Sequence, residues 1–201
     1  QIILNEIPSN GLLLSKYFNK TTLEICEGQA LDKEFENNHA INREMYLDMI
    51  NKKTGSLLGA SAALPIIYNG GSKELISVYE QFGRNLGIGF QIHDDLLEIT
   101  ADAKTMGKSL GSDIFEGKQT IMVILARESY PNEWKELLYY SDNKELMENI
   151  YLFFKENNIL QEARLISESY FKTSLNYLKK LDGIKIEELV KLVNLIEKRT
   201  Y

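Results

Sequence analysis

The sequence contains one cysteine, two histidines and three prolines, and it has no long apolar run. Cys26 cannot form an internal disulfide, which fits a reducing compartment, so the cytoplasm is the expected location. Two histidines argue against a zinc site, and His93 falls in the helical phase of apolar residues, so we expect it to be packed or hydrogen-bonded. Because no run approaches the roughly 18 to 20 apolar residues of a membrane span, no integral membrane segment is expected. The chain starts at Gln1 rather than at an initiator methionine, so we expect further sequence upstream.

Basic residues are also scarce relative to acidic ones. Lysine and arginine together number 23, against 29 aspartates and glutamates, which gives a net charge of −6. A general nucleic-acid binder carries a basic patch, so we expect no nucleic-acid partner. The chain lacks a recognisable triad of nucleophile, base and orienting residue, and Gly87-x-Gly89 lies in a predicted helix rather than after a strand. Neither acyl transfer nor dinucleotide binding is therefore supported.

The apolar residues that are present recur mainly at helical spacing. With 201 residues and 44% hydrophobic content, the chain can bury a sizeable core. Few apolar residues alternate with polar ones, so the sequence predicts an all-α fold, formed as a single domain over residues 1–201. Ser9 or Asn10, and Asn42, are candidate caps, and Pro65 predicts a disturbance in the second helix. The expected helices span residues 11–37, 42–68, 73–101, 120–129, 133–140, 144–157, 160–181 and 187–199.

The helix over residues 73–101 ends in a cluster of acids. At spacings of three and four residues, Asp94, Asp95 and Glu98 are expected to share a helix face with Gln91. Carboxylates on one face repel unless a cation lies among them, and Mg²⁺ is commonly held by one or two carboxylates together with substrate phosphates. The spacing therefore predicts half of a magnesium site, with a solvated acidic helix end as the alternative.

A glycine-rich connection with two lysines follows this acidic cluster. Residues 102–119 hold three glycines and no apolar periodicity, which predicts a long loop, and such loops are often functional. Lys108 and Lys118 lie within it, and a lysine ammonium is a compact charge suited to phosphate oxygens. Glycines let the backbone approach a ligand closely, or serve only as turn residues. Acids followed by lysines indicate a site for a metal ion and a phosphate group.

Two further polar clusters interrupt the earlier helices. Glycine inside a helix costs roughly 1 kcal/mol relative to alanine, so Gly28 indicates close packing or the approach of a ligand. Asp32, one turn further along, is another candidate metal ligand. Lys53 is followed by Thr54 and Gly55, which are poor choices for a helix interior unless the backbone or the hydroxyl has a role. The alternative is a surface lysine pair beside a helix contact.

These clusters occur in an order that is similar to that of a known family. They are Glu27-Gly28-Gln29 with Asp32, Lys53-Thr54, Phe90-Gln91 with Asp94-Asp95, Gly107-Lys108, and Gly111-x-Asp113 with Gly117-Lys118-x-Thr120. The chain resembles the C-terminal two-thirds of a trans-isoprenyl diphosphate synthase, of the polyprenyl synthase family, and within it a short-chain member of the farnesyl or geranylgeranyl type. The resemblance implies a bundle of long helices around a central cavity, and a homodimer.

The resemblance also implies a reaction and a set of metal ligands. Members of the family are prenyltransferases that join isopentenyl diphosphate to an allylic diphosphate in the presence of Mg²⁺, with release of diphosphate. Asp94 resembles the direct ligand of the second aspartate-rich motif, and Asp95 and Glu98 would support it through waters. Asp32 resembles a further acid close to the metal.

The remaining implied roles concern the diphosphate and the allylic cation. Lys53, Lys108 and Lys118, with Gln91, would hold the diphosphate group. The side chains of Thr54 and Gln91, with the main chain of Lys53, would stabilise the cation through their oxygen dipoles. Lys53, Thr54 and Gln91 are therefore the expected catalytic residues.

The sequence departs from the family pattern in one major respect. A first aspartate-rich motif with paired arginines, and an upstream basic site for isopentenyl diphosphate, are not found in it. We therefore expect the chain to be the C-terminal portion of a synthase and to be inactive alone. Glu98 stands where the family usually has aspartate, which keeps the charge. One alternative is a non-catalytic partner subunit of a heterodimeric prenyl synthase. The other is a class I terpene cyclase, which is less favoured because residues 108–120 resemble the corresponding loop of chain-elongating enzymes.

Overall fold

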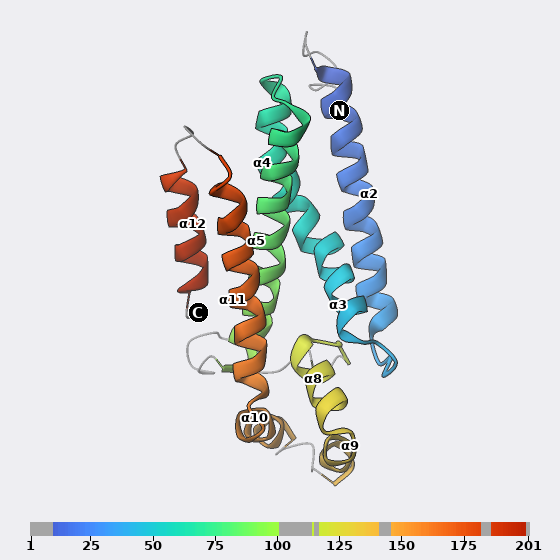
Figure 1. The fold of residues 1–201 in the computed structure, drawn as a ribbon. Helices are drawn as coiled ribbons and strands as arrows, with labels where there is room; N and C mark the ends of the chain where they lie inside the picture. The colour runs from blue at the N-terminus through green and yellow to red at the C-terminus, as the bar shows by residue number, and fades with distance from the viewer. Residues whose placement is uncertain (1–9, 101–113, 115–116, 141–145, 182–185, 200–201) are drawn as a thin grey trace.

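The computed structural model describes residues 10–100, 114, 117–140, 146–181 and 186–199 (Figure 1). All regular structure in these ranges is helical, which confirms the predicted all-α fold. No helix in them is both long enough and apolar enough to cross a membrane. The elements are α2 (Gly11–Phe35), α3 (Arg43–Ile50), the π-helix η1 (Asn51–Gly55), α4 (Ser56–Tyr68), α5 (Lys73–Thr100), α8 (Ile121–Ser129), α9 (Pro131–Tyr140), α10 (Leu146–Glu156), α11 (Ile159–Leu178) and α12 (Glu187–Glu197).

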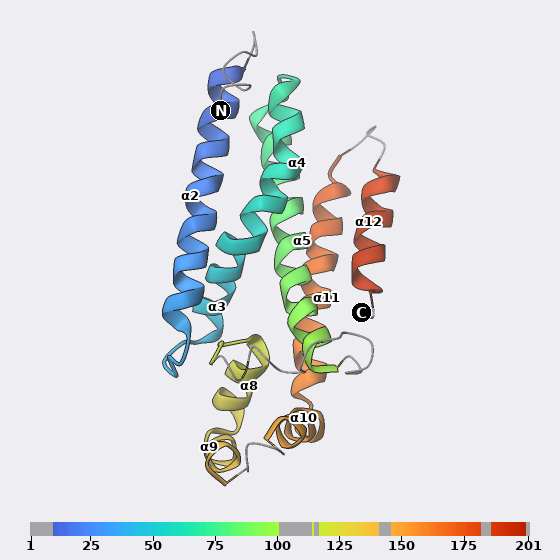
Figure 2. The same cartoon turned by 180° about the vertical axis from the view of Figure 1, so that it is seen from behind.

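Helix α5 is the central element of the bundle. Its contacts with α11 and with α4 are the most extensive between any two elements. Helix α2 packs against α4 and η1 on one side of α5, and α12 packs beside α11 on the opposite side (Figures 1 and 2). The shorter helices α8, α9 and α10 gather at the end of the bundle where α5 ends. The acidic end of α5 therefore lies close to the start of α8.

The second predicted helix consists of three parts, α3, η1 and α4. Asn42 caps it as predicted, because its Oδ1 accepts a hydrogen bond from the Met45 N–H at 2.9 Å. The disturbance predicted at Pro65 is wrong, since α4 continues through Pro65 to Tyr68. Pro65 lies in the last turn, where its missing N–H interrupts only a single hydrogen bond. The irregular turn is η1, and single π-helical turns of this kind are frequent at functional sites.

Glycines bring α2, η1 and α5 into direct backbone contact. A Cβ atom added to Gly28 would lie 2.3 Å from the backbone nitrogen of Lys53. A Cβ atom added to Gly87 would lie 2.7 Å from the Cα atom of Gly55. Since no side chain fits at either position, the backbones of α2 and α5 both pack directly on η1. The sequence signal at Gly28 is thus explained by close packing.

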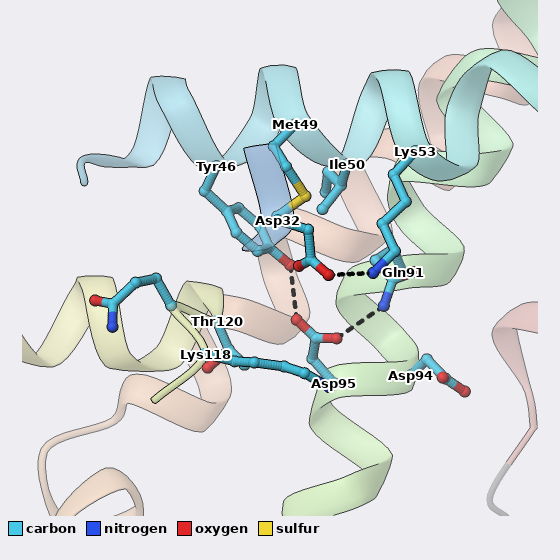
Figure 3. Close-up of a pocket in the computed structure, with 11 residues that line it drawn as sticks. Asp32, Tyr46, Met49, Ile50, Lys53, Gln91, Asp94, Asp95, Lys118 and Thr120 are labelled. Carbon is cyan, nitrogen blue, oxygen red and sulfur yellow. Dashed lines mark hydrogen bonds and ion pairs between the residues drawn. The ribbon is translucent and has the colours of Figure 1, made fainter. Parts of the chain in front are cut away.

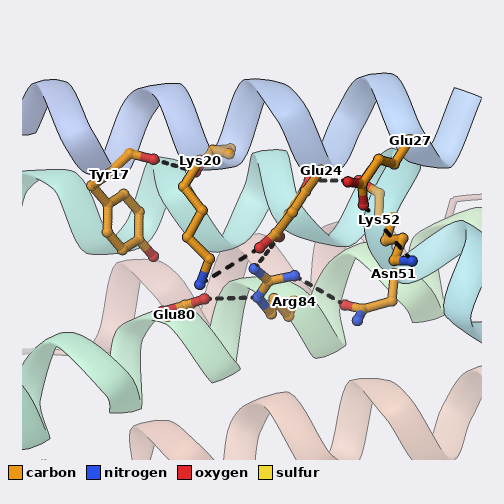
Figure 4. A network of polar contacts seen from close by, with 10 residues as sticks. Tyr17, Lys20, Glu24, Glu27, Asn51, Lys52, Glu80 and Arg84 are labelled. Atoms are coloured by element: carbon orange, nitrogen blue, oxygen red, sulfur yellow. Dashed lines mark hydrogen bonds and ion pairs between the residues drawn. The ribbon is translucent and has the colours of Figure 1, made fainter.

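A polar network joins the same three elements (Figure 4). Arg84 of α5 pairs with Glu24 of α2 at 2.5 Å and with Glu80 at 2.9 Å, and it donates to Asn51 Oδ1 of η1 at 3.5 Å. Burial by itself disfavours the charged guanidinium, but the hydrogen bonds to the two carboxylates outweigh it and raise the pKa of Arg84 above its ordinary value. The guanidinium therefore stays charged and holds α2, η1 and α5 together.

The apolar core forms two clusters on either side of α5. The larger one includes Ile92 and Leu96 of α5, together with most of α8, and the smaller one includes Phe82 and Leu86 with residues of α11 and α12. His93 lies with its ring edge-on to Phe171 at 6.2 Å, and its Nε2 atom donates to the carbonyl of Arg199 at 2.8 Å. The prediction of a packed, hydrogen-bonded histidine is confirmed.

Candidate active site

A pocket of about 230 Å³ lies where α2, α3, η1, α5 and the segment before α8 meet (Figure 3). It is lined by Asp32, Tyr46, Met49, Ile50, Lys53, Gln91, Asp94, Asp95, Lys118, Gln119 and Thr120. The lining combines three aspartates with two lysines. Four of the candidate polar clusters in the sequence supply residues that come close to one another here, although they lie far apart along the chain.

Lys53 enters the pocket from the π-helical turn. Its ammonium pairs with Asp32 Oδ2 of α2 at 2.6 Å, and the Asp32 side chain is only 14% exposed. The preceding residue, Lys52, instead pairs with Asp48 at 3.1 Å, and it does not line this pocket. The turn thus directs two consecutive lysines into different surroundings, and the surface-pair alternative does not hold for Lys53.

A chain of hydrogen bonds runs beneath the pocket from α3 through α5 to η1. The Tyr46 hydroxyl donates to Asp95 Oδ2 at 2.7 Å, and Gln91 Nε2 donates to Asp95 Oδ1 at 3.0 Å. Gln91 Oε1 in turn accepts from the Thr54 hydroxyl at 2.9 Å. Asp95 is 7% exposed and Tyr46 only 2% exposed. Asp95 is therefore a buried carboxylate with a protein donor on each oxygen.

Tyr46 is held in its protonated form by these surroundings. Burial and then the charge of Asp95 raise the pKa of Tyr46 well above its ordinary value. A backbone hydrogen bond from Ile121, at the start of α8, acts weakly in the opposite direction. The phenol is consequently a donor to Asp95 throughout the physiological pH range.

The three acids at the end of α5 do not share one environment. Asp94 lines the pocket but is turned away from Asp95, and it pairs with Arg199 at 3.3 Å (Figure 3). Glu98 lies one turn further along, is half-buried, and does not line the pocket. Adjacent helical residues point about 100° apart, so Asp94 and Asp95 cannot present both side chains in one direction. Gln91, Asp94 and Asp95 nevertheless all line the one pocket, so the predicted shared face fails only for Glu98.

The segment before α8 is anchored to the end of α2. Gly117 adopts a φ of 78°, and its carbonyl accepts from the Asn37 N–H at 2.9 Å. This contact places Lys118 and Thr120 at the pocket. Lys108 and the other residues of the predicted loop up to 113 lie outside the described residues.

Thr120 contributes a polar atom that is unusual for its surroundings. The residue is 6% exposed, and its Oγ1 atom has no hydrogen-bond partner within the described part of the chain. Buried hydroxyls nearly always have a partner, so an unpaired one at a polar pocket suits a ligand oxygen. Sequence reasoning placed Thr120 only within a motif and missed Tyr46, because Tyr46 falls in the same helical stretch as the core residues Met49 and Ile50.

The donor set fits Mg²⁺ bound partly through phosphate. No three histidine, cysteine, aspartate or glutamate side chains gather closely enough within the described ranges to hold a metal ion by themselves. Asp32 and Asp94 nevertheless bring two carboxylates to the same pocket as Lys53 and Lys118. Mg²⁺ retains several waters and takes one or two carboxylates together with substrate phosphates, so this arrangement fits it.

The fold and the pocket define an all-helical protein whose buried polar site combines carboxylates with lysines. The chain belongs to the polyprenyl synthetase family, whose family model matches residues 2–153. The family expected from the order of the motifs is thereby confirmed.

Individual relatives are similar over different shares of the chain. The short chain isoprenyl diphosphate synthase of Methanothermobacter thermautotrophicus is 42% identical over 135 residues, which are 65% of this chain and 42% of the relative. The geranylgeranyl diphosphate synthase of Sulfolobus acidocaldarius is 35% identical over 187 residues, which are 90% of this chain and 56% of the relative. The chain thus spans about half the length of these curated relatives.

A solved structure shows the same fold. The geranylgeranyl pyrophosphate synthetase of Pyrococcus horikoshii superimposes with a TM-score of 0.85 at 32% identity, over 96% of this chain and 60% of that one. The helical arrangement around α5 is therefore that of an isoprenyl synthase.

Proposed function

We propose that the chain provides part of the active site of a short-chain trans-prenyltransferase. The enzyme joins isopentenyl diphosphate to an allylic diphosphate in a Mg²⁺-dependent elongation step. The observation that carries this proposal is the convergence of Lys53 and Lys118 with Asp32 and Asp94 on one pocket, next to a Thr120 hydroxyl that has no partner among the described residues. The names of the relatives support it, because they are synthases of geranylgeranyl and other short-chain isoprenyl diphosphates.

The charged residues of the pocket act on the diphosphate. Lys53 and Lys118 bind its oxygens, together with Lys108 of the same motif set, and the Thr120 hydroxyl donates to an oxygen that reaches it. Asp32 and Asp94 would hold Mg²⁺, which when bound supplies charge neutralisation for the departing diphosphate. Glu98 supports Asp94 from the next turn of α5.

The reaction itself transfers the allylic group from oxygen to carbon. The allylic carbon–oxygen bond breaks with its electron pair on the diphosphate, leaving an allylic cation. The double bond of isopentenyl diphosphate attacks this cation and forms the new carbon–carbon bond. A proton is then lost to the released diphosphate, which restores a double bond. Thr54 and Gln91 stabilise the positive charge through their oxygen atoms, with the main chain of Lys53.

We further propose that the protein acts as a homodimer in the cytoplasm. The exposed leucines of α2, among them Leu12 at 69% and Leu23 at 60% exposure, offer apolar surface for a subunit contact. Light scattering of the purified protein measures the subunit number directly. Neither the partner-subunit nor the terpene-cyclase alternative is favoured by the relatives described above.

The decisive experiment measures diphosphate release by the full-length protein. With Mg²⁺, isopentenyl diphosphate and an allylic diphosphate, we expect release of diphosphate and a linear product five carbons longer. Asp94→Ala should abolish turnover while circular dichroism still reports the helical fold. A cyclised hydrocarbon product would support a cyclase instead. Turnover that requires a different, co-purifying synthase would support the partner subunit.

A further inference from the structure

The two neighbouring aspartates of the acidic motif differ sharply in their surroundings. Asp94 is half-exposed and faces an arginine, whereas Asp95 is buried and accepts one hydrogen bond on each oxygen, from Tyr46 and from Gln91. A ligand of a hydrated Mg²⁺ ion needs accessible lone pairs, which suits Asp94. Asp95 instead has the environment of a residue that orients its hydrogen-bond donors.

The contacts of Asp95 fix the direction of the neighbouring amide. An ionised carboxylate only accepts hydrogen bonds, so the –NH₂ group of Gln91 has to face Asp95. The carbonyl oxygen of Gln91 then faces Thr54, whose single hydroxyl hydrogen it accepts at 2.9 Å. The Thr54 hydroxyl could accept from a flipped Gln91, but the flipped amide would set its carbonyl oxygen against the Asp95 carboxylate, with no hydrogen between the two acceptors. The buried charge of Asp95 thereby selects one of the two amide orientations.

Tyr46 fixes the other side of Asp95. Its hydroxyl oxygen faces the backbone N–H of Ile121, so the phenolic hydrogen is directed to Asp95. Tyr46, Asp95, Gln91 and Thr54 therefore form a chain in which each hydrogen bond has one allowed direction. The chain ends with oxygen atoms, those of Gln91 and Thr54, whose free lone pairs attract positive charge.

We propose that Asp95 is a positioning residue and not a metal ligand. Together with Tyr46, it orients the side chains of Gln91 and Thr54 so that an allylic cation meets their oxygen atoms. This inference rests on the proposed function for the identity of the cationic species. A carbonyl oxygen directed at a cation stabilises it, and an –NH₂ group in the same place would repel it. Asp95, the acid next to Asp94, thus contributes by orienting the Gln91 amide.

Asp95→Asn provides the principal test, because it changes neither shape nor volume appreciably. The Tyr46 hydrogen attracts the asparagine oxygen, which leaves the asparagine –NH₂ group facing Gln91 and forces that amide to turn round. In the full-length protein we expect kcat to fall by about 10²-fold, the size found when one preorganised dipole is lost. Asp94→Asn is the matched control for a metal ligand.

Metal binding is measured separately from turnover, by calorimetry of inorganic diphosphate at increasing Mg²⁺ concentration. We expect Asp95→Asn to leave the Mg²⁺ requirement within a factor of about three, and Asp94→Asn to raise it by about tenfold or more. An equal rise in both variants would show that Asp95 is a metal ligand and would overturn the inference. Unchanged kcat in Asp95→Asn would overturn it as well.

A double variant distinguishes orientation from a merely structural role. With Tyr46→Phe present, the asparagine at position 95 can turn its oxygen toward Gln91 and restore the original amide direction. The double variant should therefore recover kcat relative to Asp95→Asn alone, whereas two structural lesions would add. If Asp95→Asn does not fold, Tyr46→Phe alone is informative. It should leave the Mg²⁺ requirement unchanged, while a metal-ligating Asp95 relieved of Tyr46 would bind Mg²⁺ more tightly.

Failure of the proposed function gives a different result from failure of this inference. If the wild-type protein binds Mg²⁺ and diphosphate but releases none from an allylic substrate, the prenyltransferase assignment is wrong. The calorimetric comparison of Asp94→Asn with Asp95→Asn still decides whether Asp95 is a ligand.

Discussion

At the scale of single residues, Lys53 links the local backbone to the chemistry of the pocket. Its position in η1 turns its ammonium toward Asp32, whereas Lys52 faces Asp48. The 2.6 Å pair with Asp32 restrains the long, flexible side chain of Lys53 at the site. Tyr46, two turns before Lys53, likewise restrains the Asp95 side chain through one hydrogen bond.

Replacing Lys53 tests its role on the diphosphate. Lys53→Met removes a charge-assisted hydrogen bond worth about 1.5 to 3 kcal/mol, so kcat/KM for the allylic diphosphate should fall by about 10- to 100-fold. Lys52→Met removes the same charge outside the pocket and should have a much smaller effect. Steady-state kinetics of both variants provide the comparison, and equal losses would contradict a specific role for Lys53.

Tyr46 predicts how stability depends on alkaline pH. The pKa of tyrosine is about 10 in the unfolded chain and is raised in the native state, so the stabilisation is complete below pH 10. Above pH 10 the unfolded state loses its proton first, and the stability advantage of wild type over Tyr46→Phe should shrink by about 1.4 kcal/mol per pH unit. Urea denaturation between pH 8 and 11 measures it.

The control for this pH dependence is Tyr139→Phe, because Tyr139 is 79% exposed. Its stability difference from wild type, measured over the same pH range, gives the baseline for losing a mostly exposed hydroxyl. A constant difference for Tyr46→Phe would show that the buried phenol does not retain its proton.

Residue roles were only partly predictable from the sequence. The spacing of Asp94, Asp95 and Glu98 indicates a cluster of charge, but spacing alone cannot tell which carboxylate is buried. That distinction depends on Tyr46, a partner 49 positions away, which reads as a core residue in its own helix. His93 was predictable because it follows the apolar phase of α5.

At the scale of elements, η1 is held from two sides by α2 and α5. The glycine contacts bring the backbones together, and Arg84 adds an ionic clamp to Glu24 and Glu80 (Figure 4). Helix ends and the Asn42 cap were predictable from local signals. The π-helical turn was not, because it results from packing between distant segments, and the proline that suggested a disturbance lies where a helix tolerates it.

Removing the ionic clamp should weaken the whole bundle. Arg84→Met removes the guanidinium that pairs with the partly buried Glu24 and Glu80, so the free energy of unfolding should fall by about 2 to 4 kcal/mol. Arg43 also bridges two glutamates, Glu128 and Glu162, but its side chain is 40% exposed. Arg43→Met should therefore cost less than about 1 kcal/mol. Chemical denaturation of the two variants measures this contrast, and equal costs would refute a special role for Arg84.

At the scale of the whole molecule, the pocket gathers charges of both signs from α2, η1, α5 and the segment before α8. Three aspartates and two lysines line it. A cation alone would face the lysines, and an anion alone would face the aspartates. The arrangement therefore favours a metal ion and a diphosphate that bind together.

Joint binding should be visible as a stability gain. With the Mg²⁺–diphosphate complex present at about 100 times its dissociation constant, the native state should gain about 2.7 kcal/mol. Mg²⁺ alone, diphosphate alone, or both in the presence of excess chelator should give much smaller shifts. Thermal denaturation followed by circular dichroism measures all four conditions. Additive shifts from the separate ligands would argue against a shared site.

The backbone contacts at Gly28 also limit how this protein can change over evolutionary time. A clash between two side chains can be relieved by trimming the neighbour, but the nearest atoms to a Cβ at Gly28 belong to the main chain of Lys52 and Lys53. A compensating substitution therefore has no side chain on which to act. A library of second-site changes should contain suppressors of Arg84→Met and none of Gly28→Ala. The contact between Gly28 and the η1 backbone is thus one that a second substitution cannot relieve.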